Sequence, residues 1–177
     1  MKKLSLILIA LVAGLSFSCG LLDKADVNFD MTLQQDFIVA ESGTATAVTK
    51  SYEGTLDASS NAEFVKYKDK IKDLKINRIT YKVSNYSLTT PVTFSSGSFT
   101  VDGTTLATQN EINLLSANGG AEAEITSLNA SGASALVAKL KSDSKATVKA
   151  QGTLSKTPVA FKLTTYYYVT VTASALK

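Results

Sequence analysis

The C-terminal part of the chain alternates between apolar and polar side chains, and this pattern constrains the fold more than any other feature. Between residues 159 and 173 the odd-numbered positions form one stripe: Val159, Phe161, Leu163, Thr165, Tyr167, Val169, Val171 and Ala173. Because successive side chains of a strand point to opposite faces, the pattern predicts a strand with one buried face. A strand of this length usually crosses the middle of a sheet, and Pro158 stands at its predicted start, where proline is tolerated.

Shorter alternating runs predict further strands along the chain. The clearest lie at 27–31, 79–83 and 146–150, and weaker ones lie at 37–40, 45–56, 92–94 and 99–101. Between the last two, Ser95–Ser98 predicts a hairpin loop, and Asp102-Gly103 predicts the turn after them. The apolar positions also change phase within 74–83, which predicts a bulge near Asn77-Arg78.

Two segments depart from the strand pattern and predict short helices. Ser60-Asn61-Ala62-Glu63 has the form of a capping box, which opens many helices. After it, Phe64, Tyr67, Ile71 and Leu74 recur at helical spacing and would share one face. A weaker helical pattern covers Ser131 to Ser142.

The two predicted helices stand in similar surroundings. Thr55-Leu56-Asp57-Ala58-Ser59 returns 72 positions later as Ser127-Leu128-Asn129-Ala130-Ser131. Such a match indicates either an internal duplication or a coincidence in a chain rich in Ser, Thr and Ala. We therefore predict an all-β fold, an antiparallel β-sandwich with one or two short helices. If the duplication is real, a strand-turn-helix-strand unit is used twice, and each helix plugs an open end of the sandwich.

The N-terminus carries the features of an export signal. Lys2 and Lys3 precede an apolar stretch, Leu4 to Leu15, which is too short for a transmembrane span of about twenty residues. Small residues then lead to Ser18-Cys19-Gly20, and Cys19 is the only cysteine of the chain. The arrangement resembles a bacterial lipoprotein signal with a lipobox of the Bacteroidota type. An ordinary signal peptide with a coincidental or structural cysteine is the alternative.

The resemblance to bacterial lipoproteins implies cleavage before Cys19 and acylation of its thiol. Residues 1–18 would be the signal peptide, 19–26 the acylated cysteine and tether, and 27–177 the β-sandwich domain. The protein would then be anchored in a cell-envelope membrane, most simply the outer membrane. Because Asp23, Lys24 and Asp26 form no acidic run after the cysteine, we expect the domain to face the periplasm rather than the cell surface.

Charge and composition exclude several classes of function. Without Lys2 and Lys3, 16 basic residues face 15 acidic ones, so we expect no nucleic-acid partner. The chain has no His, which removes imidazole bases and most catalytic zinc sites. We expect no metal, no cofactor and no catalytic residues. The acidic residues are dispersed without a spacing that singles out a pair, so a carboxylate-pair hydrolase is only a distant alternative.

Tyr166 and Tyr168 are the most conspicuous candidate for a binding surface. They share the face opposite the apolar stripe, where their rings would either stack on a sugar or peptide or pack within the protein. Because the sequence contains no recognisable set of catalytic residues, we predict a non-catalytic binding or scaffold module whose partner is an envelope protein or a glycan. The alternatives are a carrier that holds an apolar, lipid-like ligand between its sheets, and a fibre or adhesin subunit.

Overall fold

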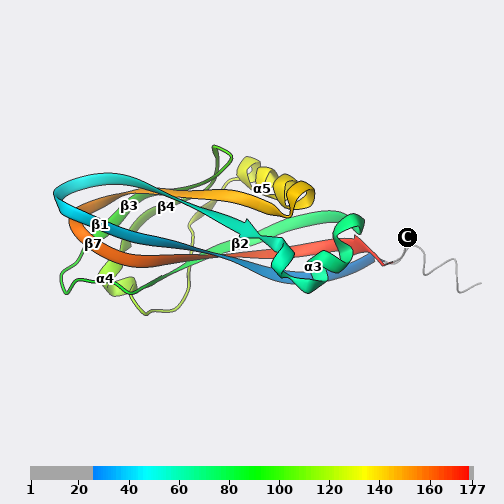
Figure 1. Cartoon of the computed structure of the whole chain (residues 1–177), viewed down its shortest axis with the longest axis horizontal. Helices are drawn as coiled ribbons and strands as arrows, with labels where there is room; N and C mark the ends of the chain where they lie inside the picture. Colours follow the sequence, from blue (N-terminus) through cyan, green and yellow to red (C-terminus); the bar gives the residue numbers. More distant parts are fainter. Residues whose placement is uncertain (1–25, 176–177) are drawn as a thin grey trace, which may run out of the picture.

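The computed structural model describes residues 26–175, which form one antiparallel sheet with helices along its open side and ends (Figure 1). The strands are β1 (Asp26–Asp57), β2 (Ile71–Ser84), β3 (Thr93–Val101), β4 (Thr104–Asn113), β5 (Ala123–Glu124), β6 (Ser127–Leu128) and β7 (Lys145–Ser174). The α-helices are α3 (Ala62–Tyr67), α4 (Leu114–Ala117) and α5 (Ala130–Asp143). Two single-turn 3-10 helices, η1 (Ala58–Ser60) and η2 (Lys68–Lys70), flank α3.

Strand β7 is the central strand, as the alternating pattern predicts. It pairs with β1 along its whole length, while its other edge pairs with β3 in the first half and with β2 in the second. All eight residues of the predicted stripe are buried. The predicted start at Pro158 is wrong, because β7 begins at Lys145. Buried positions are even-numbered up to Leu154 and odd-numbered from Thr157, with Thr164 as the exception. This change of phase makes one continuous strand look like two in the sequence.

The β1–β7 ribbon folds back on itself near its middle. Lys50 Nζ lies 2.7 Å from Glu41 Oε2, although nine residues of extended strand would span roughly 30 Å. The pairing is irregular between Glu41 and Ala45, opposite Thr157-Pro158, and Gly43 has a φ of +80°. Glycine suits this bend because it has no Cβ to oppose a positive φ.

The fold-back curls the sheet into a half-barrel, so the all-β prediction is confirmed in its coarse form. The predicted sandwich of separate sheets is not what forms, because β1 and β7 run through the bend and belong to both arms of one sheet. At the other side, the chain between β5 and β6 links the two sheet edges. Ile125 N, directly after β5, donates to Ile79 O at 3.0 Å, and Asn129 N, directly after β6, donates to Leu106 O at 2.8 Å.

Large side chains fill the space inside the curl. Tyr167, Phe37, Phe64, Phe94 and Phe99 are all essentially inaccessible to solvent. Burying aromatic side chains of this size contributes much of the hydrophobic stabilisation of a domain. The interior is therefore packed, and open hollows lie on the surface.

The first helix is shorter than predicted. Asn61 is its N-cap, accepting from Phe64 N at 2.9 Å, whereas the sequence pattern placed the cap at Ser60. Ile71 and Leu74 belong to β2 rather than to the helix, because they pair with Ala173 and Val171 of β7. Sheet pairing thus overrides the local helical spacing. The second predicted helix is confirmed as α5.

The predicted turns have mixed outcomes. Asp102-Gly103 forms the β3–β4 turn with positive φ at both residues, 48° and 79°, as predicted. The bulge near Asn77 is confirmed by the register shift between Ile76 and Arg78. The hairpin loop predicted at Ser95–Ser98 is wrong, because these residues lie inside β3. Their small polar side chains mark a bulge, with a shift of register against β7 and a φ of 52° at Ser96.

The proposed repeat holds only for the turn and the cap. Asp57 Oδ1 accepts from Ser59 N at 2.9 Å, and Asn129 Oδ1 accepts from Ser131 N at the same distance. Each cap follows a strand and precedes a helix and another strand. The packing differs, however, since Leu56 is fully buried whereas its counterpart Leu128 is 40% exposed.

Several predictions fall on residues outside the described range. These are the signal peptide at residues 1–18, the acylation site Cys19 and the tether up to Ala25. Among residues 26–175, no helix combines the length and apolar character that crossing a bilayer requires.

Candidate functional site

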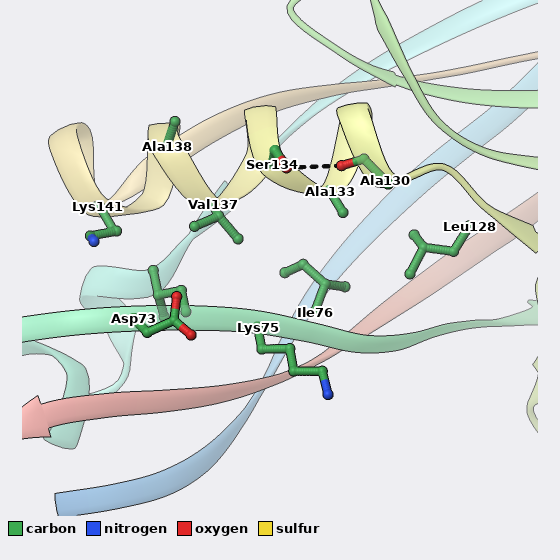
Figure 2. Close-up of a pocket in the computed structure, with 11 residues that line it drawn as sticks. Asp73, Lys75, Ile76, Leu128, Ala130, Ala133, Ser134, Val137, Ala138 and Lys141 are labelled. Atoms are coloured by element: carbon green, nitrogen blue, oxygen red, sulfur yellow. Dashed lines mark hydrogen bonds between the residues drawn. The ribbon is translucent and has the colours of Figure 1, made fainter. Parts of the chain in front are cut away.

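An open groove runs between α5 and β2 (Figure 2). It has a volume of about 650 Å³, which lies in the range of small-molecule sites. Ile76 of β2 and Val137 of α5 point into it from opposite sides, and Leu128 closes the end near the start of α5. Leu128 is one of the few large apolar residues that stay exposed in the described part of the chain.

The groove results from the order of side-chain sizes on α5. Gly132, Leu136 and Leu140 are the buried stripe that holds the helix on the sheet. The neighbouring stripe carries Ala133 and Val137 towards β2. These short side chains leave the space between helix and strand unfilled.

Charged groups stand along the groove and at one end of it. Lys75, Lys141 and Asp73 belong to its lining, and no carboxylate of the described residues lies within 4 Å of either ammonium group. Lys141 Nζ donates to Lys72 O at 2.9 Å, and Lys72 forms an ion pair with Asp26. The Lys141 end of the groove therefore lies at the same end of the sheet as the start of β1, with β7 between β1 and β2.

Tyr166 and Tyr168 lie half-buried on the outer face of β7, as their alternation predicts. Tyr168 is engaged by its neighbours: its hydroxyl donates to Glu122 Oε2 at 2.7 Å, and the Arg78 guanidinium lies 4.1 Å from its ring centroid. A smaller hollow of about 290 Å³ adjoins this ring beside Asp30. Hydrogen bonds from Thr80 and Tyr168 lower the pKa of the Glu122 carboxyl.

Acidic side chains on the outer face bind hydroxyl groups across the β1–β7 ribbon. Thr170 donates to Asp30 at 2.6 Å, and Thr164 donates to Asp36 at 2.7 Å. Desolvation raises the pKa of Asp36, but hydrogen bonds from Thr164, Gln34 and Lys162 outweigh it and leave a net lowering. Cross-strand pairs of this kind stabilise a sheet. These carboxylates therefore have a structural role in the ribbon.

The number of carboxylates in the groove limits the acid–base chemistry that it could support. Asp73 is the one carboxylate in its lining, whereas glycoside hydrolysis by the usual route requires two that flank the bond. Within residues 26–175, no three His, Cys, Asp or Glu side chains gather to hold a metal ion. The groove therefore offers mainly apolar contact, with Lys141 and Asp73 near one end (Figure 2).

The sequence did not single out the groove residues. The one available signal was the row of small side chains on the second face of α5, and it becomes meaningful only once β2 is known to lie opposite. Comparison of the chain with known protein families, characterised proteins and solved structures gave no match.

Proposed function

We propose that this protein is a lipid-anchored component of a bacterial cell envelope whose sheet domain is a non-catalytic binding module. Acylation of Cys19 would hold it at the outer membrane, facing the periplasm. The binding site would be the groove between α5 and β2. The observation that carries the proposal is the position of this groove, whose Lys141 end lies at the end of the sheet where β1 begins at Asp26, linked to it through Lys72.

The tether keeps the domain near the membrane. Seven residue steps separate Cys19 from Asp26, and a fully extended chain covers at most about 25 Å over that length. Each acyl CH₂ buried in a bilayer contributes about 0.8 kcal/mol, so two or three chains make a lasting anchor. A groove at the tethered end is then held close to the lipid surface and to other envelope components.

The lining of the groove supports binding rather than catalysis. Its walls are aliphatic, with Ile76 and Val137 facing each other, and one carboxylate provides no acid–base pair. Ligand sites are typically concave and mostly apolar, with a few polar groups that orient the ligand. Lys141 would be the orienting group here, since the side chain of Lys75 points away from α5 (Figure 2).

Two experiments test this function. Metabolic labelling with radioactive palmitate should mark the wild type and leave Cys19→Ser unmarked; an unlabelled wild type would refute the anchor. Affinity capture from solubilised envelope should recover a partner that Ala133→Phe loses, since the Ala133 side chain points towards β2 and a ring there would fill the groove (Figure 2). Ser142→Phe is the matched control, because Ser142 is exposed on α5 and does not line the groove. Equal recovery by both variants would refute the site.

The edge of β1 favours a second candidate, a fibre or adhesin subunit. Among the described residues β1 pairs only with β7, so its outer edge has no strand partner. Unpaired edges accept strands from other chains. A subunit of this kind would form concentration-dependent polymers in sedimentation velocity, whereas a monomer at all concentrations would exclude it.

A further inference from the structure

We propose that the hollow beside Tyr168, on the outer face of the sheet, binds one ring of a neutral sugar between the Asp30 carboxylate and the Arg78 guanidinium. The hollow shares no lining residue with the groove between α5 and β2. It depends neither on that groove nor on acylation of Cys19. The inference therefore goes beyond the proposed function and adds a second binding site to the domain.

The hollow lies over β7, between the two strands that flank it. Asp30 belongs to β1 and Arg78 to β2, and both strands pair with the stretch of β7 that contains Tyr168. Neighbouring strands are about 4.8 Å apart, so these two residues start from strands roughly 10 Å apart. The volume of the hollow is about 290 Å³, close to the lower end of the roughly 300–1,000 Å³ that small-molecule sites occupy. A single ring that hydrogen-bonds on both sides suits this width and volume.

Arg78, the only arginine of the sequence, supplies the hydrogen-bond donors of the hollow. Its guanidinium lies 4.1 Å from the centroid of the Tyr168 ring. That ring is held in turn by Glu122 Oε2, which accepts from the Tyr168 hydroxyl at 2.7 Å and from Thr80 Oγ1 at 2.6 Å. No carboxylate of residues 26–175 lies within 4 Å of the guanidinium. Stacking on a fixed ring therefore positions Arg78 while its N–H groups remain available to a ligand.

Asp30 and Asn77 supply the hydrogen-bond acceptors, and Thr170 holds both of them. Asn77 Nδ2 donates to Thr170 Oγ1 at 2.8 Å, and Thr170 Oγ1 donates to Asp30 Oδ1 at 2.6 Å. This chain of hydrogen bonds crosses from β2 over β7 to β1. Asp30 Oδ2 and Asn77 Oδ1 take no part in it, so both oxygens can accept from a ligand.

The combination of these groups matches the chemistry of a sugar. A hydroxyl group both donates and accepts hydrogen bonds, so neighbouring hydroxyls of one ring can donate to Asp30 and accept from Arg78. A charged ligand would be attracted by one of these two residues and repelled by the other. A neutral ring with several hydroxyls uses both, and hydrogen bonds to ionised groups are the stronger kind. The Tyr168 ring adds apolar surface beside them.

A glycan array followed by an NMR titration tests the inference. The array carries neutral oligomers of glucose, galactose, mannose and N-acetylglucosamine, together with oligomers of uronic acids. The purified protein should bind neutral members. Titration of ¹⁵N-labelled protein with the neutral oligomer that binds best should shift the backbone amides of the lining residues Asp30, Thr32, Asn77, Arg78 and Val169. Binding of uronic-acid oligomers alone, binding of no glycan, or shifts that leave these amides unmoved would overturn the inference.

Two variants with matched controls test the residues themselves. Asp30→Asn keeps an oxygen for Thr170 but loses the carboxylate, and Arg78→Lys keeps the charge but loses the paired N–H donors. Each should weaken binding of that neutral oligomer by roughly ten-fold or more, because a hydrogen bond to a charged group is lost. Asp36→Asn and Lys82→Gln should leave binding unchanged, since Asp36 and Lys82 lie on the same two strands but do not line the hollow. Wild-type affinity in Asp30→Asn or Arg78→Lys, or an equal loss in the matching control, would contradict the site.

The outcomes also separate this site from the groove of the proposed function. Ala133→Phe should leave the affinity for the neutral oligomer unchanged, because Ala133 lines only the groove. If the oligomer instead shifts the amides of Ile76 and Val137 and Ala133→Phe abolishes its binding, the sugar occupies the groove and this inference is wrong. If no glycan binds while an envelope partner is captured through the groove, the inference fails and the proposed function stands.

Discussion

Gly132 provides the sharpest test of how α5 is seated on the sheet. A Cβ atom at this position would lie 2.1 Å from Thr105 O and 2.4 Å from Leu106 Cα, both of them backbone atoms of β4. Backbone atoms cannot rotate aside as the end of a side chain can, so Gly132→Ala must move the helix away from the strand. Overpacking of this kind costs roughly 1–3 kcal/mol.

Helix propensity acts in the opposite direction at this position. Alanine is favoured over glycine by about 1 kcal/mol in a helix interior, and the substitution also reduces the entropy of the unfolded chain. The net expectation is a loss of roughly 1–2 kcal/mol of unfolding free energy, since the clash with two backbone atoms falls at the upper end of the overpacking range. For a domain of this size the midpoint of thermal unfolding should fall by about 2–8 °C.

Gly54→Ala is the matched control. A Cβ atom there would also approach a neighbour to 2.1 Å, but the neighbour is Nε2 of Gln35, at the end of a flexible side chain. Rotation of Gln35 would relieve the contact at the loss of one hydrogen bond to the Asp36 carbonyl, worth about 1 kcal/mol. Thermal and urea unfolding of both variants measure the difference. If Gly132→Ala proved as stable as the wild type, the close packing of α5 on β4 would be refuted.

Two further predictions concern ionisable groups. Hydrogen bonds with Lys50 and Tyr52 lower the pKa of Glu41, so its carboxylate stabilises the fold at pH values above the ordinary pKa of 4.5, and this stabilisation is lost as the pH falls through the lowered pKa of the folded state. In urea unfolding, the stability advantage of the wild type over Glu41→Gln should therefore shrink on acidification. A difference that stays constant with pH would contradict the contact. Tyr168→Phe removes a hydrogen bond that lowers the pKa of Glu122, so an NMR titration should show a higher Glu122 pKa in the variant than in the wild type. An unchanged pKa would mean that the Tyr168 hydroxyl does not bond to Glu122.

Local patterns in the sequence determined several of the strands, their buried faces and some irregularities, whereas β4, β5 and β6 were not predicted. The stripe from Val159 to Ala173 predicted both the strand and its burial, because a period of two leaves one face for the core. Asp102-Gly103 predicted its turn through residues that tolerate positive φ. The end of the first helix depended instead on β7, which draws Ile71 and Leu74 into a strand.

Tertiary structure alone decided the shape of the sheet and the candidate site. The fold-back brings Lys50 to Glu41, and the change of phase at the bend makes two halves of one strand look like separate strands. The groove depends on β2 and α5, which lie more than forty residues apart in sequence, so the short side chains of α5 border a groove only once the chain has folded. Periodicity reports which way a side chain points, whereas pairing between distant segments determines what it meets.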